Sequence, residues 1–202
     1  MRLRLSNTTQ IQEELILVTV LSELYRKHVT QTGKKYIWHS RSMAAEYSAN
    51  ALQTVAANAP VIFTESPVPC RAGLVFHRDE SGIFRLANNA GGSSCGCGCG
   101  CKRVYETLYN VTFHGNIAIS EGGTVEPIQL SISIDGEADP SSTMIVTPAA
   151  VGDFANVGAE IIVAVPSLCG CESISVRNTS TQAVDVQNAN LTVDYVGIRR
   201  VF

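Results

Sequence analysis

The side chains best suited to chemistry in this sequence are cysteines gathered in two short runs. In the first run four cysteines alternate with glycine, and in the second two cysteines flank one glycine. The six are Cys95, Cys97, Cys99, Cys101, Cys169 and Cys171. Three interpretations are open: thiolate ligands for a soft metal ion, disulfide cross-links to a partner loop or a neighbouring chain, and a reduced loop with no special role.

The spacing of these cysteines fits neither chemistry closely. Structural zinc sites usually place two or more residues between paired ligands, and a Cys-Gly-Cys pair rarely bridges itself. A seventh cysteine, Cys70, stands alone, so at least one thiol of each chain would be left for a bond between chains. We therefore keep the six as candidate cross-link or soft-metal positions, and we predict no cofactor and no dedicated metal site.

No residue pattern indicates catalysis. The sequence has no Gly-x-Ser-x-Gly nucleophile motif, no phosphate-binding loop and no His-x-His pair for a metal-dependent oxygenase. We expect His77 and His114 to be solvated residues on strand faces. A pair of carboxylates for glycoside cleavage depends on spacing in three dimensions, which the sequence leaves open. The prediction is a protein without catalytic residues that is not an enzyme.

Composition restricts the partners. Only 16% of the 202 residues are charged, against about a quarter in typical domains, and the net charge is −3. Such a chain has no electrostatic attraction for nucleic acid. No apolar run approaches the roughly 20 residues that span a bilayer, and no signal peptide is recognisable, because Glu13 and Glu14 precede the one early apolar run. We expect no nucleic-acid and no membrane partner; a surface of uncharged polar residues suits a packed assembly.

The chain divides near Met43. Residues 1–42 read as a helix over about residues 10–28, because Ile11, Leu15 and Val18 recur at helical spacing, followed by a basic linker. This stretch is either an anchoring or trimerising helix or the product of a start codon assigned too far upstream. Residues 43–58 are rich in alanine and form either a helix capped by Ser42 or an extended lead-in segment. Residues 59–202 form the main domain.

From residue 60 the hydrophobic period becomes two, which is typical of β-strands with one wet face. Short alternating segments recur at regular intervals, and Asp135-Gly136 is a hairpin turn signal. The strands are expected around residues 61–64, 74–76, 83–86, 109–119, 130–134, 161–165, 174–176, 184–186 and 191–195. This pattern predicts an all-β antiparallel jelly-roll sandwich. Its core is expected to include Tyr109, Phe113, Ile132 and Val193.

Four stretches carry a resemblance to a known group of proteins. They are Tyr109–Ile119, Ile128–Gly136, Ser173–Thr179 and Asn188–Tyr195. Their order and form resemble the trimeric jelly rolls of the tumour-necrosis-factor and complement-globular-head type. They are more similar to the bacterial version that ends collagen-like spore-surface glycoproteins, and to small jelly-roll proteins of phages and prophages. The resemblance covers about residues 58–197.

The resemblance implies a homotrimer packed around a threefold axis, with neighbouring shell or capsid proteins as partners. No Gly-X-Y repeat precedes the domain, which favours the phage type over the spore type. The expected function is a structural module that decorates a virion, as a head decoration or a fibre tip. The alternative is a structural or adhesive module of a spore or cell surface that binds glycans, since jelly rolls often carry sugar sites in their end loops.

Overall fold

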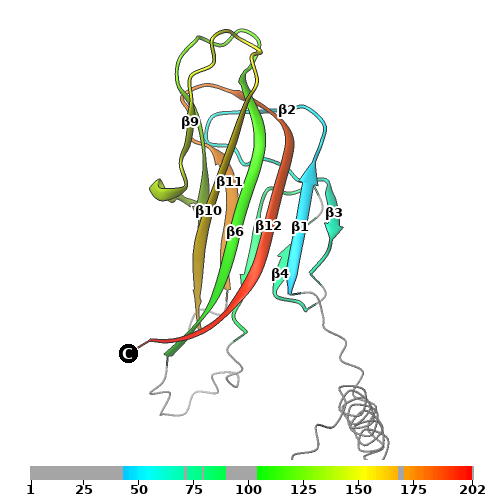
Figure 1. The fold of residues 1–202 in the computed structure, drawn as a ribbon, viewed down its shortest axis with the longest axis vertical. Helices are drawn as coiled ribbons and strands as arrows, with labels where there is room; N and C mark the ends of the chain where they lie inside the picture. The colour runs from blue at the N-terminus through cyan, green and yellow to red at the C-terminus, as the bar shows by residue number, and fades with distance from the viewer. Residues whose placement is uncertain (1–42, 71, 79, 90–103, 168–170, 202) are drawn as a thin grey trace, which may run out of the picture. The chain divides into compact units, whose positions relative to one another are not determined.

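The computed structural model describes residues 43–70, 72–78, 80–89, 104–167 and 171–201, all within one unit of the chain, Arg41–Phe202. The helix and linker predicted for residues 1–42 lie outside the described residues. The described part is a sandwich of two antiparallel sheets (Figure 1). Its elements, in chain order, are β1 (Ala44–Ala49), β2 (Gln53–Val55), β3 (Glu65–Val68), β4 (Val75–His77), β5 (Phe84–Ala87), β6 (Val104–Ile119), β7 (Ile128–Ile134), β8 (Glu137–Ala138), the 3-10 helix η1 (Pro140–Ser142), β9 (Met144–Val146), β10 (Ala155–Pro166), β11 (Cys171–Asn178) and β12 (Val184–Val201).

The larger sheet has the order β10-β6-β12-β1-β3, with β2 also paired to β12. Its two central strands, β6 and β12, are 16 and 18 residues long. The sequence predicted separate strands around Val184–Val186 and Leu191–Tyr195, but the structure joins them in one strand with a bulge between Gln187 and Asn190. Asn188 takes a positive φ of 53° at this bulge, a conformation that asparagine tolerates better than most residues.

The smaller sheet has the order β4-β5-β11-β7-β8, with β9 also paired to β7. The predicted hairpin between residues 74–76 and 83–86 is confirmed as β4 and β5. The predicted Asp135-Gly136 turn is also confirmed: both residues have positive φ, 49° and 87°, and they connect Ile134 to its partner Glu137. Two consecutive positive φ angles are typical of the two-residue turns whose twist matches that of the strands. The jelly-roll sandwich predicted from the alternation is thus the observed fold.

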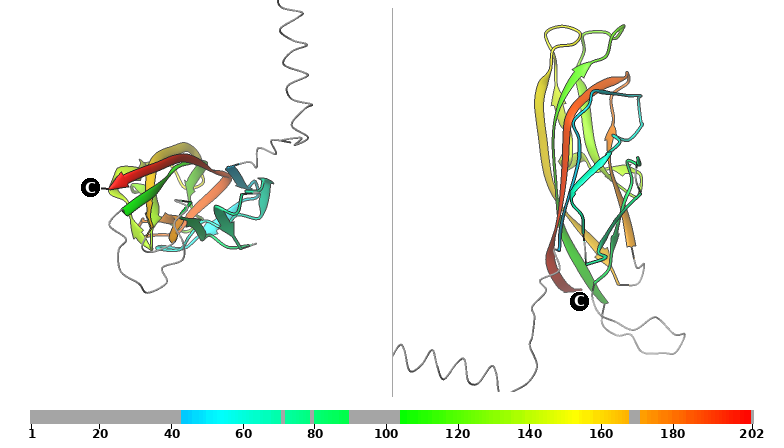
Figure 2. Two further views of the ribbon diagram at one scale, coloured as in Figure 1. Left: turned by 90° about the horizontal axis from the view of Figure 1, so that it is seen from below. Right: turned by 90° about the vertical axis from the view of Figure 1, so that its right-hand side faces the viewer.

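Figure 2 shows the two sheets from two further directions, and the buried hydrophobic side chains of both sheets form one core. The four residues predicted for it, Tyr109, Phe113, Ile132 and Val193, are all fully buried. The Tyr109 hydroxyl, on the larger sheet, donates a hydrogen bond to the carbonyl of Ala87 on the smaller sheet. Burial of this ring raises the pKa of the phenol, so the hydroxyl stays a donor. Tyr109 therefore connects the two layers through a polar contact as well as through packing.

Residues 43–58 contain the strands β1 and β2 and no helix, so the helix considered for them is wrong. Ala45, Tyr47 and Ala49 point into the core from β1, while Ala44 and Glu46 lie on the other face. The small alanines fit where β1 packs between β12 and β3, and the period of two prevails over the helix propensity of alanine. The strand expected at residues 61–64 is likewise absent. Phe63 makes one isolated bridge to Ser81, and the backbone bonds of the segment are divided between the sheets, because Val61 N donates to Val176 on β11 and Thr64 N donates to Ser48 on β1.

Side-chain amides take the place of strand partners at several turns. The Gln53 amide donates to the carbonyl of Ile62 and accepts from its N–H, at 3.0 and 2.9 Å. Gln182 makes the same two bonds with Thr124, both at 2.8 Å. The fully buried Asn178 donates to the carbonyls of Val55 and Gln182 and accepts from the N–H of Ser180. These amides satisfy backbone groups that the short strands leave unpaired.

Candidate functional site

Of the six candidate cysteines, only Cys171 is among the described residues, and Cys95, Cys97, Cys99, Cys101 and Cys169 are not. Cys171 begins β11 opposite Ala87, and Arg85 Nη2 donates to its Sγ over 2.9 Å. Cys70 is half-buried and packs against the core. No disulfide joins these two described thiols. The metal and cross-link interpretations of the six cysteines stay predictions.

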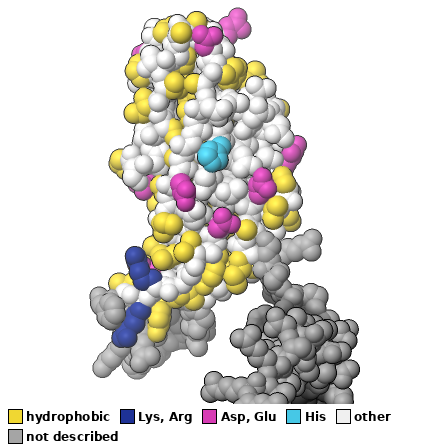
Figure 3. All heavy atoms as spheres, viewed as in Figure 1, with side chains coloured by type: hydrophobic (Ala, Val, Ile, Leu, Met, Phe, Trp, Pro, Cys, Tyr) yellow, Lys and Arg dark blue, Asp and Glu magenta, His cyan; other side chains and the backbone are white. Residues whose placement is uncertain are grey.

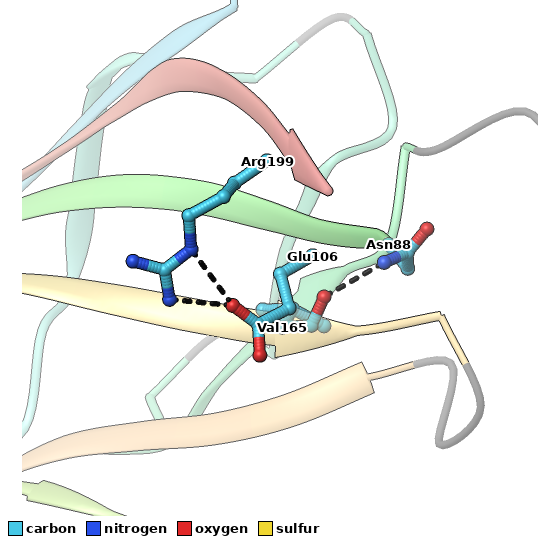
Figure 4. A network of polar contacts seen from close by, with 4 residues as sticks. All are labelled: Asn88, Glu106, Val165 and Arg199. Carbon is cyan, nitrogen blue, oxygen red and sulfur yellow. Dashed lines mark hydrogen bonds and ion pairs between the residues drawn. The ribbon is translucent and has the colours of Figure 1, made fainter. Parts of the chain in front are cut away.

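The residues that flank the two cysteine runs lie together at one end of the sandwich. Asn88 Nδ2 donates to the Val165 carbonyl at 2.7 Å, and the Tyr105 carbonyl accepts from Ser167 N at 2.8 Å. Figure 4 shows this end, where Arg199 also pairs with Glu106 across β12 and β6, with Nη2 to Oε2 at 2.6 Å. The described residues on both sides of each cysteine run therefore lie at the same end of the fold.

The two described histidines differ. His114 is exposed on the outward face of β6, as expected. His77 contradicts the expectation of a solvated residue: its ring stacks on Phe84 with centroids 4.4 Å apart, and Nε2 lies 2.7 Å from the Ser81 carbonyl. His77 shares the inward phase of β4 with the buried Val75, while Phe76 between them is exposed, so strand alternation itself places the His77 ring against Phe84. Among the described residues, no group of three or more His, Cys, Asp or Glu side chains is placed to hold a metal ion.

A pair of carboxyl groups lies where the turn after β7 meets the first residues of β11. Asp135, in the turn after β7, accepts hydrogen bonds from Ser173 N and Oγ at 2.8 and 2.9 Å. A hydrogen bond with Asp135, aided by burial and by the negative charge there, raises the pKa of Glu172 to about 7. The same bond and those from Ser173 lower the pKa of Asp135. Glycosidase carboxyls stand roughly 5–9.5 Å apart to flank the scissile bond, whereas these two touch, so this pair does not have that geometry.

The outward face of the larger sheet carries an apolar patch that crosses three strands. It consists of Leu108, Ile162, Ala164 and Val196. Ala164 pairs with Leu108, and Val196 occupies the bulge of β12 opposite Leu108. Ile162 is 57% exposed and Val196 is 54% exposed. Figure 3 views this face and shows hydrophobic side chains gathered on its lower part.

The rest of this face is polar. Thr112, Asn190 and Thr192 are half-buried and uncharged, and Glu160 and Asp194 are exposed beside the apolar patch. Sequence reasoning missed the patch because it counted apolar residues only toward the core. One signal was present: Ile161, Ile162 and Val163 are three consecutive apolar residues in β10, and alternation can bury only the first and third. No helix of the described residues is long and apolar enough to cross a bilayer.

Comparison with known proteins identifies a fold and no family. No protein-family model matches the chain, and no curated protein matches it. Among solved structures, the Eiger TNF of S. frugiperda matches with a TM-score of 0.51 and 10% identity, over 77% of this chain and 92% of that one. Rabbit GITRL (TM-score 0.37, 13% identity, 76% and 93%) and a family 35 carbohydrate-binding module from Clostridium thermocellum (TM-score 0.32, 12% identity, 76% and 98%) overlap less well.

The first of these likenesses, with the two antiparallel sheets, shows that the chain has a TNF-like jelly-roll fold. At 10% identity this is a statement of fold, and function must be argued from the surfaces of this chain.

Proposed function

We propose that the protein is a non-enzymatic structural module that assembles as a homotrimer through the outward face of its larger sheet. The observation that carries the proposal is the apolar patch of Leu108, Ile162, Ala164 and Val196. Two of its side chains are more than half exposed in the single chain. Contiguous exposed apolar surface of this kind marks interaction sites, because covering it removes apolar area from water. A second copy of the chain is the occupant that the resemblance to trimeric jelly rolls implies, and closed rotational symmetry is the norm for such assemblies.

The carboxylates beside the apolar patch should make the assembly depend on salt. Glu160 and Asp194 flank it, with Asp194 and Ile162 on either side of Asn110 in the same row of the sheet. Copies that meet through the patch bring these carboxylates toward one another. The trimer should therefore tighten as salt is raised from about 0.01 to 0.15 M, where screening shortens the reach of this repulsion from about 30 to 8 Å.

Light scattering on the full chain tests the assembly. We expect a mass of about 65 kDa, three times the 21.6 kDa of one chain, with and without reductant. Ile162→Glu should give the single-chain mass, because the substitution buries a charge in the interface. Ile145→Glu is the matched control, since Ile145 is an equally exposed isoleucine on the smaller sheet. A single-chain mass for the natural protein would contradict the proposal, and a trimer lost only on reduction would assign assembly to the cysteines.

The location that we propose is the surface of a phage or prophage particle. The weakly charged composition supports it. Mass spectrometry of particles released after prophage induction, alongside purified spores of the same source, tests this placement. Recovery with the particles is the expected result, and recovery with the spores would replace the virion by the spore-surface alternative.

A further inference from the structure

A pocket opens on the outward face of the smaller sheet, on the opposite side of the sandwich from the apolar patch. Its volume is about 300 Å³, at the lower end of the range for small-molecule sites. Pro60 and Ile83 form one side, and Asp135, Ser175 and Arg177 form the other. Ile83 is more than half exposed, so an apolar surface is open to a ligand.

The pocket exists because β11 changes partners along its length. Its first half pairs with β5, as far as the pair Ile174 and Phe84. Further along, the segment before β3 takes over, with Pro60 bridged to Arg177 and Val61 N donating to the Val176 carbonyl at 2.8 Å. Ser175 lies at the junction between the two partners, and its side chain lines the pocket.

Two neighbouring serine hydroxyls at this junction form no hydrogen bond with the described residues, and one of them, Ser133 Oγ, is a buried atom. Ser175 is only 8% exposed and lines the pocket, yet its Oγ forms no hydrogen bond with any described residue. Ser133 is its direct partner on β7; it is fully buried, and its Oγ has no partner among the described residues either. Buried polar groups are nearly always hydrogen-bonded, so an unpaired hydroxyl that lines a pocket points to a ligand or bound water.

The charged groups of the pocket are held in fixed positions. Arg177 donates through Nε and Nη2 to the carbonyl of Asn58 and through Nη1 to that of Gly136, at 2.9 Å for the latter. These bonds use three of the five N–H groups of the guanidinium and leave two to donate. Asp135 is fixed by Ser173 and keeps its negative charge, because hydrogen bonds hold its pKa low. The pocket thus presents a rigid donor and a rigid acceptor on either side of a free hydroxyl.

We propose that this pocket binds one saccharide unit of a glycan. A sugar hydroxyl both donates and accepts, so neighbouring hydroxyls can donate to Asp135 and accept from Arg177 and Ser175. The C–H surface of a sugar ring can pack against Pro60 and Ile83. A free anion fits less well, because Asp135 places a negative charge at the pocket wall. The site lies on the smaller sheet and is independent of the proposed trimer, which uses the larger one.

The test is saturation-transfer NMR of the full chain against a panel of free hexoses, deoxyhexoses, N-acetylhexosamines and sialic acid, followed by titration of each that binds. At least one sugar should bind, and inorganic phosphate should not displace it. Ser175→Ala should weaken binding about fivefold, as expected for one lost hydrogen bond, without destabilising the fold, since its hydroxyl has no protein partner to lose. Ile83→Ala should weaken binding similarly through lost apolar contact.

Ile145→Ala is the matched control, because Ile145 is an exposed isoleucine on the same sheet outside the pocket. Its affinity for the sugar should equal that of the natural protein. Absence of binding across the panel would overturn the proposal. So would binding that survives both pocket substitutions unchanged, and phosphate that binds in place of sugar would make the pocket an anion site.

Discussion

The two sheets of this sandwich bury the same kind of residue on the inside and differ on the outside. The outward face of the larger sheet is continuous along two long strands and carries an apolar patch beside polar, uncharged side chains. The outward face of the smaller sheet is built from short strands with changing partners, and it is hollowed where one partner of β11 gives way to the next. Long strands that keep the same partners make a surface that another protein can cover. Short strands that change partners make a recess that a small ligand can enter.

The difference shows how one core can support two kinds of surface. Alternation fixes which side chains enter the core, and it leaves the outward positions free to vary. On β10 that freedom is used for an extra isoleucine, Ile162, and on β11 for a row of Ser173, Ser175 and Arg177. This difference between the faces requires that the two sheets unfold as a single cooperative unit. It also requires that the recess depends on local contacts.

The largest effect is expected from the core that the sheets share. Phe113→Ala on the larger sheet and Phe84→Ala on the smaller sheet each remove a fully buried ring and should each lower the free energy of unfolding by about 3–5 kcal/mol. Urea denaturation followed by far-ultraviolet circular dichroism measures this. Both variants should unfold in one transition. If the Phe84→Ala protein lost the smaller sheet in a separate first step, the two sheets would not be one cooperative unit.

A smaller effect is expected from a matched pair of glycines. A Cβ at Gly82 would lie 2.5 Å from the Val61 carbonyl oxygen and 2.6 Å from Pro60 Cβ, so Gly82→Ala must displace backbone at the pocket wall. We expect a loss of about 2 kcal/mol and weaker sugar binding. A Cβ at Gly158 on the larger sheet would meet the exposed ring of His114, 2.5 Å from Nδ1, and that ring can turn away. Gly158→Ala should therefore cost under about 1 kcal/mol.

Thermal denaturation of both variants compares their losses of stability. At Gly82 the new Cβ meets backbone at the pocket wall, and at Gly158 it meets the side chain of His114. Equal losses would mean that the pocket wall yields as easily as the His114 ring, and the recess would then not be a rigid feature.

The smallest effect concerns the carboxyl pair beside the pocket. Glu172 has a folded pKa of about 7, above its ordinary 4.5, so it binds its proton more tightly in the folded state. Its contribution to stability is therefore full below about pH 4.5 and is lost as pH rises through about 7. Asp135 has the opposite sign: its pKa is lowered from 3.8, and its contribution is lost only on acidification below that value.

Glu172→Gln isolates the pH-dependent contribution of Glu172 to stability, because an amide can donate to Asp135 at every pH. Unfolding curves at pH 4.5, 6 and 8 should show the stability of the natural protein falling relative to the variant as pH rises. A constant difference across this range would mean that Glu172 and Asp135 do not share a proton in solution.

Much of the fold could be predicted from alternation. Tyr109, Phe113, Ile132 and Val193 were correctly assigned to the core, and Asp135-Gly136 to a turn, because both signals are local. The strand β1 was ambiguous, since alanine favours helices and only the fit between β12 and β3 decides its conformation. The missing strand at residues 61–64 has a similar cause: its backbone bonds are divided between two sheets, which no local pattern encodes.

Little of the candidate sites could be predicted. The pocket gathers Pro60, Ile83, Asp135 and Arg177 from four separate segments, so its existence depends on strand register, which the sequence does not reveal. The cysteines drew attention because their pattern is local and unusual, and five of the six lie outside the described residues. The resemblance to TNF-like jelly rolls predicted the fold correctly, because it rests on the order of strands that the fold preserves.

The amide groups that join the turns have a consequence for the conditions that the module can withstand. Gln53, Gln182 and Asn178 connect loops to strands through paired hydrogen bonds with backbone atoms. None of these groups gains or loses a proton between strong acid and strong base, and dissolved ions do not screen them as they screen surface ion pairs. A module joined in this way keeps its loops in place through changes of acidity and salinity that would loosen one held by charged side chains.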